Sequence, residues 1–421
     1  MKHNMQHLSV VLSGALLMSS VSGVFAQETG LAFFEPLDKI ITKKSSAIHI
    51  DVGIGSGACR LAGDPQGILY TITDRGPNIK TQNAEKYLDV DFGRKKGKIF
   101  PVPNFAPAIY KIQIKNDQVK VLEKIQIKNI VGKPVTGISN PGTEKAWGIN
   151  GRALPFDPGG IDAEGIVKLS DGTFWIGEEY GPSILHIAAD GRVLKHWVPE
   201  GVKASLEGAG YEINEKLPGI LRARKLNRGI ESMTASPDEQ YLYFAMQSPL
   251  ANPDKSAYHK GNAVRIFKVD RQNSRLVGEY VYVLDAPESF VLDNRKKKRK
   301  QSDVKVGELT SIDTDKLVVL ERISKTTKFY LVDLGKAENI LAGKWDDPAT
   351  HPTLEQVGAD SVTTQEKHLL LNTDAEGGLM KKIEGLAWFG KNSWIMVNDN
   401  DFGIEGDPTI FAHVSMKTDL D

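Results

Sequence analysis

The amino-acid sequence predicts an all-β protein, and two observations support this fold class. Short apolar runs such as Tyr241–Phe244 and Lys316–Leu320 alternate with turns rich in Gly, Asp, Asn and Pro, which is typical of strands in series. The 421 residues include 40 Gly and 20 Pro, more turn formers than a helical bundle uses. The best helical candidate lies around residues 204–221, and we interpret it as an insertion between strands.

Residues 1–26 have the pattern of a secretory signal peptide. Lys2 precedes an apolar stretch from Leu8 to Met18, and Val24-Phe25-Ala26 offers small or modest residues before a cleavage point at Gln27. The apolar stretch is far shorter than the ~20 residues that cross a membrane. We therefore expect an exported, periplasmic or extracellular product with no transmembrane segment. No linker divides residues 27–421, so we expect one domain there.

A repeat refines the fold class. A glutamate begins the first strand of each unit at Glu164, Glu231, Glu308 and Glu384, spaced by about 70 to 80 residues, which suits four strands and their loops. A fifth unit has Ser56 at this position. The sequence therefore predicts a β-propeller with five or six four-stranded blades. The long interval between Ser56 and Glu164 holds either a sixth blade or an insertion.

The last unit contains only three obvious strands, which end near Val414. A propeller ring closes when a strand from the other end of the chain completes such a blade. We expect the closing strand to come from the N-terminal segment, within 31–41 or 47–52.

The repeated glutamates are candidate metal ligands. First strands line the central channel of a propeller, and four converging carboxylates repel one another unless a cation or protons intervene. Calcium accepts six to eight oxygen ligands in irregular geometry, so it is the expected cofactor for Glu164, Glu231, Glu308 and Glu384. In the alternative interpretation, these glutamates cap backbone amides or pair with arginine inside the repeat.

A second polar series follows the second strands. It includes Asp74 and Arg75, Glu179, Arg322, and Asp399. Glu179 or Asp74 could act as a general base, Asp399 could contact the metal, and Arg75 and Arg322 could hold an anion through their guanidinium groups. Both arginines could instead form ion pairs with neighbouring acids.

Basic residues gather in two loops. Arg222, Arg224 and Arg228 precede the Glu231 strand and could bind an anionic substrate, although a solvated loop is the alternative. Residues 295–300 are six consecutive Arg or Lys, which we interpret as a solvated loop or a surface-binding segment.

The composition and the absence of one motif argue against a nucleic-acid partner, a disulfide and a serine nucleophile elbow. The 53 basic and 53 acidic residues give zero net charge, which argues against a nucleic-acid partner. The single cysteine, Cys59, excludes an intramolecular disulfide. No G-x-S-x-G pattern occurs, so the nucleophile elbow of serine hydrolases is absent.

Five segments together resemble the phytase-like family described as having "esterase-like activity of phytase". They are residues 73–77 (TDRGP), 160–166 (GIDAEGI), 175–182 (WIGEEYGP), 227–232 (NRGIES) and 383–386 (IEGL). The resemblance covers roughly residues 50–411. It implies an exported β-propeller that hydrolyses ester or phosphoester bonds.

We accordingly expect a metal-dependent hydrolase that acts on phosphate esters or other esters, with a small anionic or ester substrate. A bound metal polarises the scissile group and activates water, which suits a chain without a serine or cysteine nucleophile. Two alternatives are a calcium-dependent lactonase and a non-catalytic propeller that binds a ligand or partner. The sequence leaves the oligomeric state open.

Overall fold

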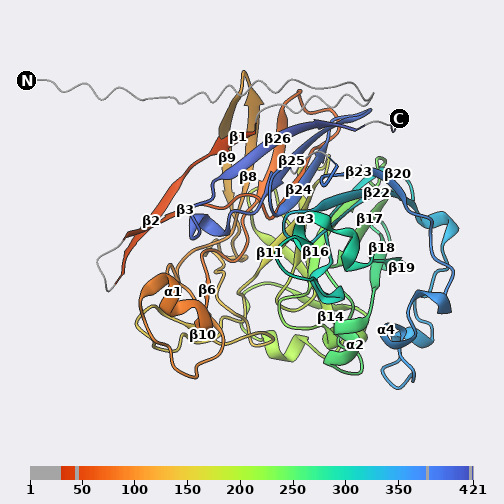
Figure 1. Ribbon diagram of the computed structural model, residues 1–421, viewed down its shortest axis with the longest axis horizontal. Helices are drawn as coiled ribbons and strands as arrows, with labels where there is room; N and C mark the ends of the chain where they lie inside the picture. The colour runs from red at the N-terminus through yellow and green to blue at the C-terminus, as the bar shows by residue number, and fades with distance from the viewer. Residues whose placement is uncertain (1–29, 43–46, 376–378, 417–419, 421) are drawn as a thin grey trace, which may run out of the picture.

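The fold is described from a computed structural model that covers residues 30–42, 47–375, 379–416 and 420. The expected signal peptide lies outside the described residues. Strands dominate the chain (Figure 1), and the described α-helices are short: α1 (Ala84–Leu88), α2 (Lys255–Lys260), α3 (Val291–Asn294) and α4 (Leu354–Val357). None of these helices has the length and apolar character needed to cross a membrane. The protein is therefore all-β.

Five sheets carry most of the strands. The first is β4 (Gly57–Cys59), β5 (Ile68–Ile72), β8 (Ala108–Lys115) and β9 (Gln118–Gln126). The second is β11 (Ala163–Lys168), β12 (Phe174–Glu178), β13 (Ser183–Ile187), β14 (Val193–Pro199) and β15 (Ile213–Leu217). The third is β16 (Ile230–Ala235), β17 (Tyr241–Met246), β18 (Ala263–Asp270) and β19 (Arg275–Val283).

The fourth sheet is β20 (Lys305–Asp313), β21 (Lys316–Arg322), β22 (Thr327–Asp333) and β23 (His368–Asn372). The fifth is β24 (Ile383–Trp388), β25 (Ser393–Asn398), β26 (Thr409–Ser415) and β1 (Leu31–Phe33). In the fifth sheet β1 pairs antiparallel with β26, and Leu31 lies opposite Phe411. A strand from the N-terminal segment thus completes the last sheet, as the sequence predicts.

The first strands of the five sheets lie side by side. β4, β11, β16, β20 and β24 contact one another in chain order, and β24 also contacts β4. Apolar side chains fill the spaces between neighbouring sheets: Ile72 packs with Ile166 between the first and second, and Leu320 with Trp394 between the fourth and fifth. Burial of such side chains contributes roughly 1.5–3 kcal/mol each. The hydrophobic core is therefore divided among the interfaces between sheets.

Two smaller sheets lie outside this arrangement. One is the hairpin of β2 (Pro36–Ile41) and β3 (Ala47–Asp51), which reaches away from the other sheets (Figure 1). The other joins β6 (Ile79–Lys80), β7 (Lys98–Ile99) and β10 (Ala146–Trp147). This second sheet and α1 occupy part of the long interval between Ser56 and Glu164, which holds no further four-stranded sheet among the described residues.

The helix expected around residues 204–221 is a wrong prediction. Two short 3-10 turns, η2 (Lys203–Leu206) and η3 (Gly219–Ala223), flank β15, which pairs parallel with β14 and extends the second sheet. Gly208 and Gly210 have φ values of 90° and 82°, a left-handed backbone that ends a right-handed helix. The local conformation therefore interrupts the apolar spacing that suggested a helix.

Candidate functional site

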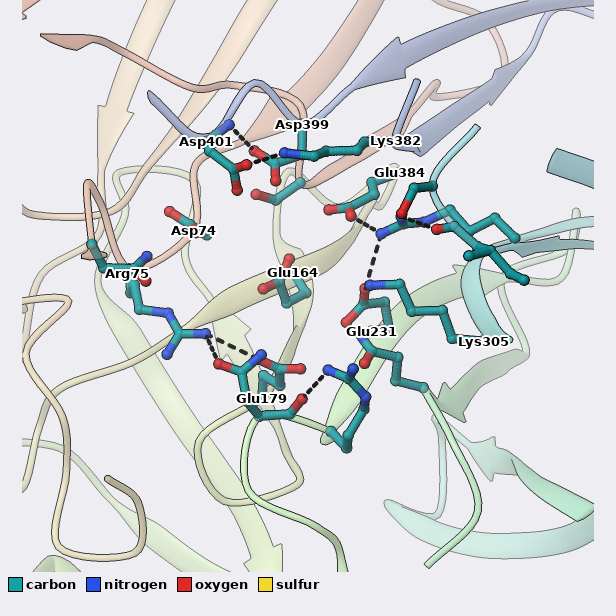
Figure 2. Close-up of a pocket in the computed structure, with 18 of the residues that line it drawn as sticks. Asp74, Arg75, Glu164, Glu179, Glu231, Lys305, Lys382, Glu384, Asp399 and Asp401 are labelled. Carbon is teal, nitrogen blue, oxygen red and sulfur yellow. Dashed lines mark hydrogen bonds and ion pairs between the residues drawn. The ribbon is translucent and has the colours of Figure 1, made fainter. Parts of the chain in front are cut away.

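A polar cavity of about 320 Å³ lies where the first strands of the sheets converge (Figure 2). Most of the carboxylates that line it lie at the starts of first strands or just after the ends of second strands. They are Asp74, Glu164, Glu179, Glu231, Asp303, Glu384, Asp399 and Asp401. The cations that line it are Arg75, Lys80, Lys98, Arg228, Arg299, Lys305, Arg322 and Lys382.

Beside this cavity the first strands pack closely against one another. A Cβ atom on Gly57 would come within 2.4 Å of the Glu164 carbonyl oxygen, and one on Gly165 within 2.4 Å of the Met233 amide nitrogen. Any side chain at these positions would force the strands apart. The glycines that follow the repeated polar position therefore allow the first strands to approach one another.

Glu308 behaves differently from the other repeated glutamates. It does not line the cavity, and its side chain is fully buried. Its Oε1 accepts a hydrogen bond from the Leu309 amide (2.9 Å), and its Oε2 accepts one from the Ala58 amide (3.4 Å). Burial raises the pKa of Glu308 well above its usual range. The structure thus places Glu308 as a cap for backbone amides, apart from the expected ligand set.

Three carboxylates form the most compact acidic group. Asp74 follows β5, Asp162 precedes β11, and Glu164 is the second residue of β11; ligand oxygens of the three lie within 4.8 Å of one another. Burial raises the pKa of Asp74 to about 6. Burial, followed by the charges of Glu231 and Asp162, raises the pKa of Glu164 well above its usual range. Arg75 pairs with Asp162, and the three carboxylates together keep an excess of negative charge.

Arg75 is surrounded by acids. Its Nη2 lies 2.5 Å from Asp162 Oδ2 and 3.1 Å from Glu179 Oε2, and its Nη1 lies 3.3 Å from Glu144 Oε1. Nη2 also donates to Asn227 Oδ1 at 2.7 Å. The guanidinium is only 4% exposed. Both Nη atoms thus hold carboxylates, which corresponds to the ion-pair alternative considered for this residue, although the pairs are buried.

Three oxygen atoms in the cavity wall have no hydrogen-bond partner among the described residues. They are Oε1 of Glu179, Oε2 of Glu231 and Oε1 of Gln247, and all three side chains are about 2% exposed. A buried polar oxygen without a partner costs about 1–3 kcal/mol. A group that supplies positive charge or hydrogen-bond donors would satisfy these three atoms.

On the opposite wall, Arg322 contacts two of the repeated glutamates. Its Nη2 forms an ion pair with Glu384 Oε1 and lies 3.8 Å from Glu231 Oε1. Lys305, at the start of β20, lies 4.0 Å from the same Glu231 oxygen. Burial and then the charge of Arg322 lower the pKa of Lys305 to about 7. These two cations partly neutralise this side of the cavity.

Asp399 and Asp401 follow β25 at the edge of the cavity. Asp399 Oδ1 accepts a hydrogen bond from the Asp401 amide at 2.8 Å, and Asp401 forms an ion pair with Lys382. Burial, followed by the charges of Asp401 and Asp74, raises the pKa of Asp399 to about 8. Asp399 therefore belongs electrostatically to the same acidic surface as Asp74 (Figure 2).

The expected basic lip is only partly present. Arg228 lines the cavity, whereas Arg222 is exposed and Arg224 donates to the Gly142 carbonyl at 3.0 Å; neither lines the cavity. Arg222 and Arg224 lie in or next to η3, which directs the chain past the cavity before Arg228 reaches it. For these two residues the placement fits the alternative of a loop outside the site.

A strongly basic groove of about 640 Å³ adjoins the cavity and shares Lys80, Lys98, Asn227 and Arg228 with it. Its cations are Lys80, Arg94, Lys95, Lys96, Lys98, Lys225 and Arg228. None of them forms an ion pair with a carboxylate in the described part of the chain, and the one acid that lines the groove, Glu144, is bound by Arg75. The groove therefore has a large unbalanced positive charge.

Sequence reasoning missed several residues of this site. Asp162 lies two positions before Glu164, so alternation along a strand could have indicated it. Lys305 is the first residue of β20, and a basic residue at the end of a strand gives no signal of a functional role. Lys98 comes from the insertion after β5, and Arg299 from the 295–300 basic run. For Lys98 and Arg299 no local pattern pointed to the cavity.

The all-β architecture and the buried acidic cavity define a protein with a polar site at the meeting point of its sheets. The sequence profile described as "Phytase-like: Esterase-like activity of phytase" matches residues 54–402. This chain belongs to the phytase-like family.

A curated relative is the "Uncharacterized secreted protein" of Arthroderma benhamiae, which is 26% identical over 255 residues. The match covers 53% of this chain and 48% of that protein, so the chain spans about half the length of the curated relative it matches.

Solved structures show only distant likeness. A luciferin-regenerating enzyme is 10% identical, with a TM-score of 0.36 and 92% of each chain covered. A PQQ-bound aldose sugar dehydrogenase from Streptomyces coelicolor is 8% identical, with a TM-score of 0.34 and coverage of 94% of this chain and 98% of that one. A protein from Lactobacillus plantarum is 10% identical, with a TM-score of 0.34 and coverage of 88% and 89%.

Proposed function

We propose that this chain is an exported, metal-dependent hydrolase of anionic esters, with phosphate esters as the first candidates. The observation that carries the proposal is the set of buried oxygens without partners, Glu179 Oε1, Glu231 Oε2 and Gln247 Oε1, in one cavity with the Asp74, Asp162 and Glu164 group. Membership of the phytase-like family supports hydrolysis, and the secreted relative supports export after removal of residues 1–26.

We also propose that the five larger sheets are the blades of a five-bladed propeller, because their first strands contact one another cyclically.

The donor set fits calcium. Every candidate ligand is an oxygen, the ligand type that calcium prefers, and the irregular arrangement suits its variable geometry. Asp74, Asp162 and Glu164 are the residues we assign to hold the ion, with Glu231 on the facing wall. Glu384 and Asp399 line the same cavity, and we keep them as candidate outer ligands. Glu308 is left out of this assignment because its oxygens accept backbone amides.

Bound calcium would polarise the scissile ester and favour ionisation of a water molecule. Within the protein, Arg75 holds Oε2 of Glu179 and leaves Oε1 free of protein donors, so we assign Glu179 as the general base that takes a proton from water. Arg75 then acts by orienting Glu179. Arg322 and Lys305 lie on the facing wall and would stabilise negative charge that develops on the ester.

The basic groove supports an anionic substrate. Its seven cations lack carboxylate partners in the described residues, and it opens into the same cavity through Lys98 and Arg228. Repulsion among like charges that line one groove is relieved when an anion binds. A neutral ester would gain nothing from this surface, so we place phosphate esters ahead of acyl esters and lactones.

The test combines metal binding with turnover. We expect calcium to raise the unfolding temperature and EDTA to remove the effect, and p-nitrophenyl phosphate to be hydrolysed faster than a p-nitrophenyl acyl ester or a lactone. Glu179→Gln should abolish turnover while calcium still stabilises the protein; Glu366→Gln, at a side chain that is 83% exposed, is the matched control. Turnover of lactone alone would favour a lactonase. Absence of both turnover and calcium response would favour a binding propeller.

A further inference from the structure

The connection between β19 and β20, which carries the basic run 295–300, forms part of the cavity wall. Arg295, Lys296, Lys297, Lys298 and Lys300 are exposed, whereas Arg299 turns toward the cavity and lines it. Asp303, a few residues later, lines it as well. One residue of the run therefore differs from its neighbours in position.

Arg299 is held by a buried carboxylate. Its Nη2 lies 3.3 Å from Asp293 Oδ1, and its Nε donates to the Asp293 carbonyl oxygen at 3.1 Å. These contacts use one edge of the guanidinium, and Nη1 has no hydrogen-bond partner among the described residues. The side chain keeps 28% of its surface exposed. Arg299 thus has a fixed orientation and a donor that is available to a ligand.

Asp293 also fixes the loop that follows β21. Its carboxylate, which is fully buried, accepts hydrogen bonds from the amides of Lys325 (2.9 Å) and Thr326 (2.8 Å), and more weakly from that of Ser324 (3.3 Å). Ser324 and the preceding Ile323 line the cavity next to Arg322. Asp293 therefore joins the two segments that form this side of the wall.

A second carboxylate fixes the start of the connection. Asp374, after β23, accepts hydrogen bonds from the Val291 amide at 2.7 Å and the Leu292 amide at 3.1 Å. It also accepts one from the Thr326 hydroxyl at 2.7 Å. The segment that leads to Arg299 is therefore attached at several points, while the other five residues of the run are exposed, as expected for a solvated loop.

We propose that Arg299 is a specificity-determining residue that binds an oxyanion group of the substrate at the rim of the cavity, and that Asp293 is its positioning residue. The inference rests on the proposed function for its substrate. A guanidinium fixed on one edge recognises a phosphate or carboxylate oxygen with little loss of side-chain freedom. Arg299 lines the cavity from a segment separate from those that carry the candidate metal ligands, so it would bind a group of the substrate other than the one that the metal contacts.

The test measures binding of inorganic phosphate by calorimetry, with and without calcium. Arg299→Ala should weaken phosphate binding at least tenfold, since hydrogen bonds to charged groups are worth that much or more. Lys297→Ala is the matched control, because it removes the same charge from an exposed neighbour, and it should change the Kd less than twofold. Equal effects of the two variants, or no phosphate binding by the wild type, would overturn the inference.

Asp293 is tested through a double-mutant cycle. Asp293→Asn should weaken phosphate binding in the wild type and have no further effect on the Kd in Arg299→Ala, whereas its cost in stability should persist in both backgrounds. If Asp293→Asn raises the Kd by the same factor in both backgrounds, Asp293 is a structural residue and does not act through Arg299. If Asp293→Asn does not fold, the comparison of Arg299→Ala with Lys297→Ala decides alone. Phosphate binding that depends on Arg299 without calcium response or turnover would refute the proposed function only. A calcium response with phosphate binding that ignores Arg299 would refute this inference only.

Discussion

Glu164 offers the sharpest test of whether the cavity is built for a cation. Its oxygens lie within 4.8 Å of those of Asp74 and Asp162, and the charged groups that most affect its pKa are all carboxylates. Replacing Glu164 with Gln keeps the shape of the side chain and removes one negative charge. The metal-free protein should therefore become more stable, and the calcium complex should become weaker.

The magnitude follows from the spacing. Two carboxylates whose ligand oxygens lie within 4.8 Å of each other repel by at least about 3 kcal/mol when both are ionised and the effective dielectric constant is near 20. Since burial raises the pKa values of Asp74 and Glu164, part of this repulsion is already relieved by protonation. We expect Glu164→Gln to add about 1–2 kcal/mol to the free energy of unfolding in EDTA. The loss of a charged ligand should raise the calcium Kd at least tenfold.

Urea unfolding in EDTA and calorimetric titration with calcium measure the two effects on the same samples. Glu366→Gln, at an exposed position, should change neither quantity. If Glu164→Gln lowers stability in EDTA and binds calcium as the wild type does, the carboxylate is a structural group, and the reasoning from charge repulsion fails.

Three further predictions concern buried polar groups. Arg75→Met leaves the buried carboxylates of Asp162 and Glu179 without their counter-ion and should lower the free energy of unfolding by about 3–5 kcal/mol in urea titrations; a loss below 1 kcal/mol would contradict the ion-pair assignment. Glu308→Ala should cost about 1–3 kcal/mol for each of the two amides it leaves unpaired. Glu308→Gln keeps one acceptor oxygen and should cost about half as much, with calcium affinity unchanged. Burial lowers the pKa of His196 from 6.5 to about 3, so the free energy of unfolding should be highest above pH 6.5 and should fall as the pH drops toward 3. His196→Gln should flatten the stability profile between these pH values, and an unaltered profile would contradict the assignment of this pH dependence to His196.

Much of the fold could be predicted because its signals are local. Alternating apolar residues and Gly-containing turns mark each strand, and the spacing of the repeated glutamates marks where each first strand begins. The closing role of β1 followed from the missing strand of the last sheet. Residues 204–221 were misread because apolar spacing alone does not reveal a backbone turned by Gly208 and Gly210.

The site is harder to predict from the sequence, because its geometry depends on contacts between distant segments. The repeat placed Glu164, Glu231 and Glu384 around one cavity but could not show that Glu308, at the equivalent position, turns to backbone amides. Likewise, the basic run looked like a uniform charged loop, and only the buried Asp293 distinguishes Arg299 from its neighbours. Such differences arise from packing partners that no sequence window contains.

The pairing of β1 with β26 also constrains when the protein can finish folding. Leu31 meets Phe411, so nearly the whole described chain must be synthesised before the two strands can join. Contacts between such distant residues form slowly, because the entropy of closing the intervening chain is lost before the contacts are gained. A chain that emerges from the ribosome N-terminus first would hold β1 without its partner until the end of synthesis. Delayed closure of this kind leaves β26 and β1 without each other for most of the time that the chain takes to fold.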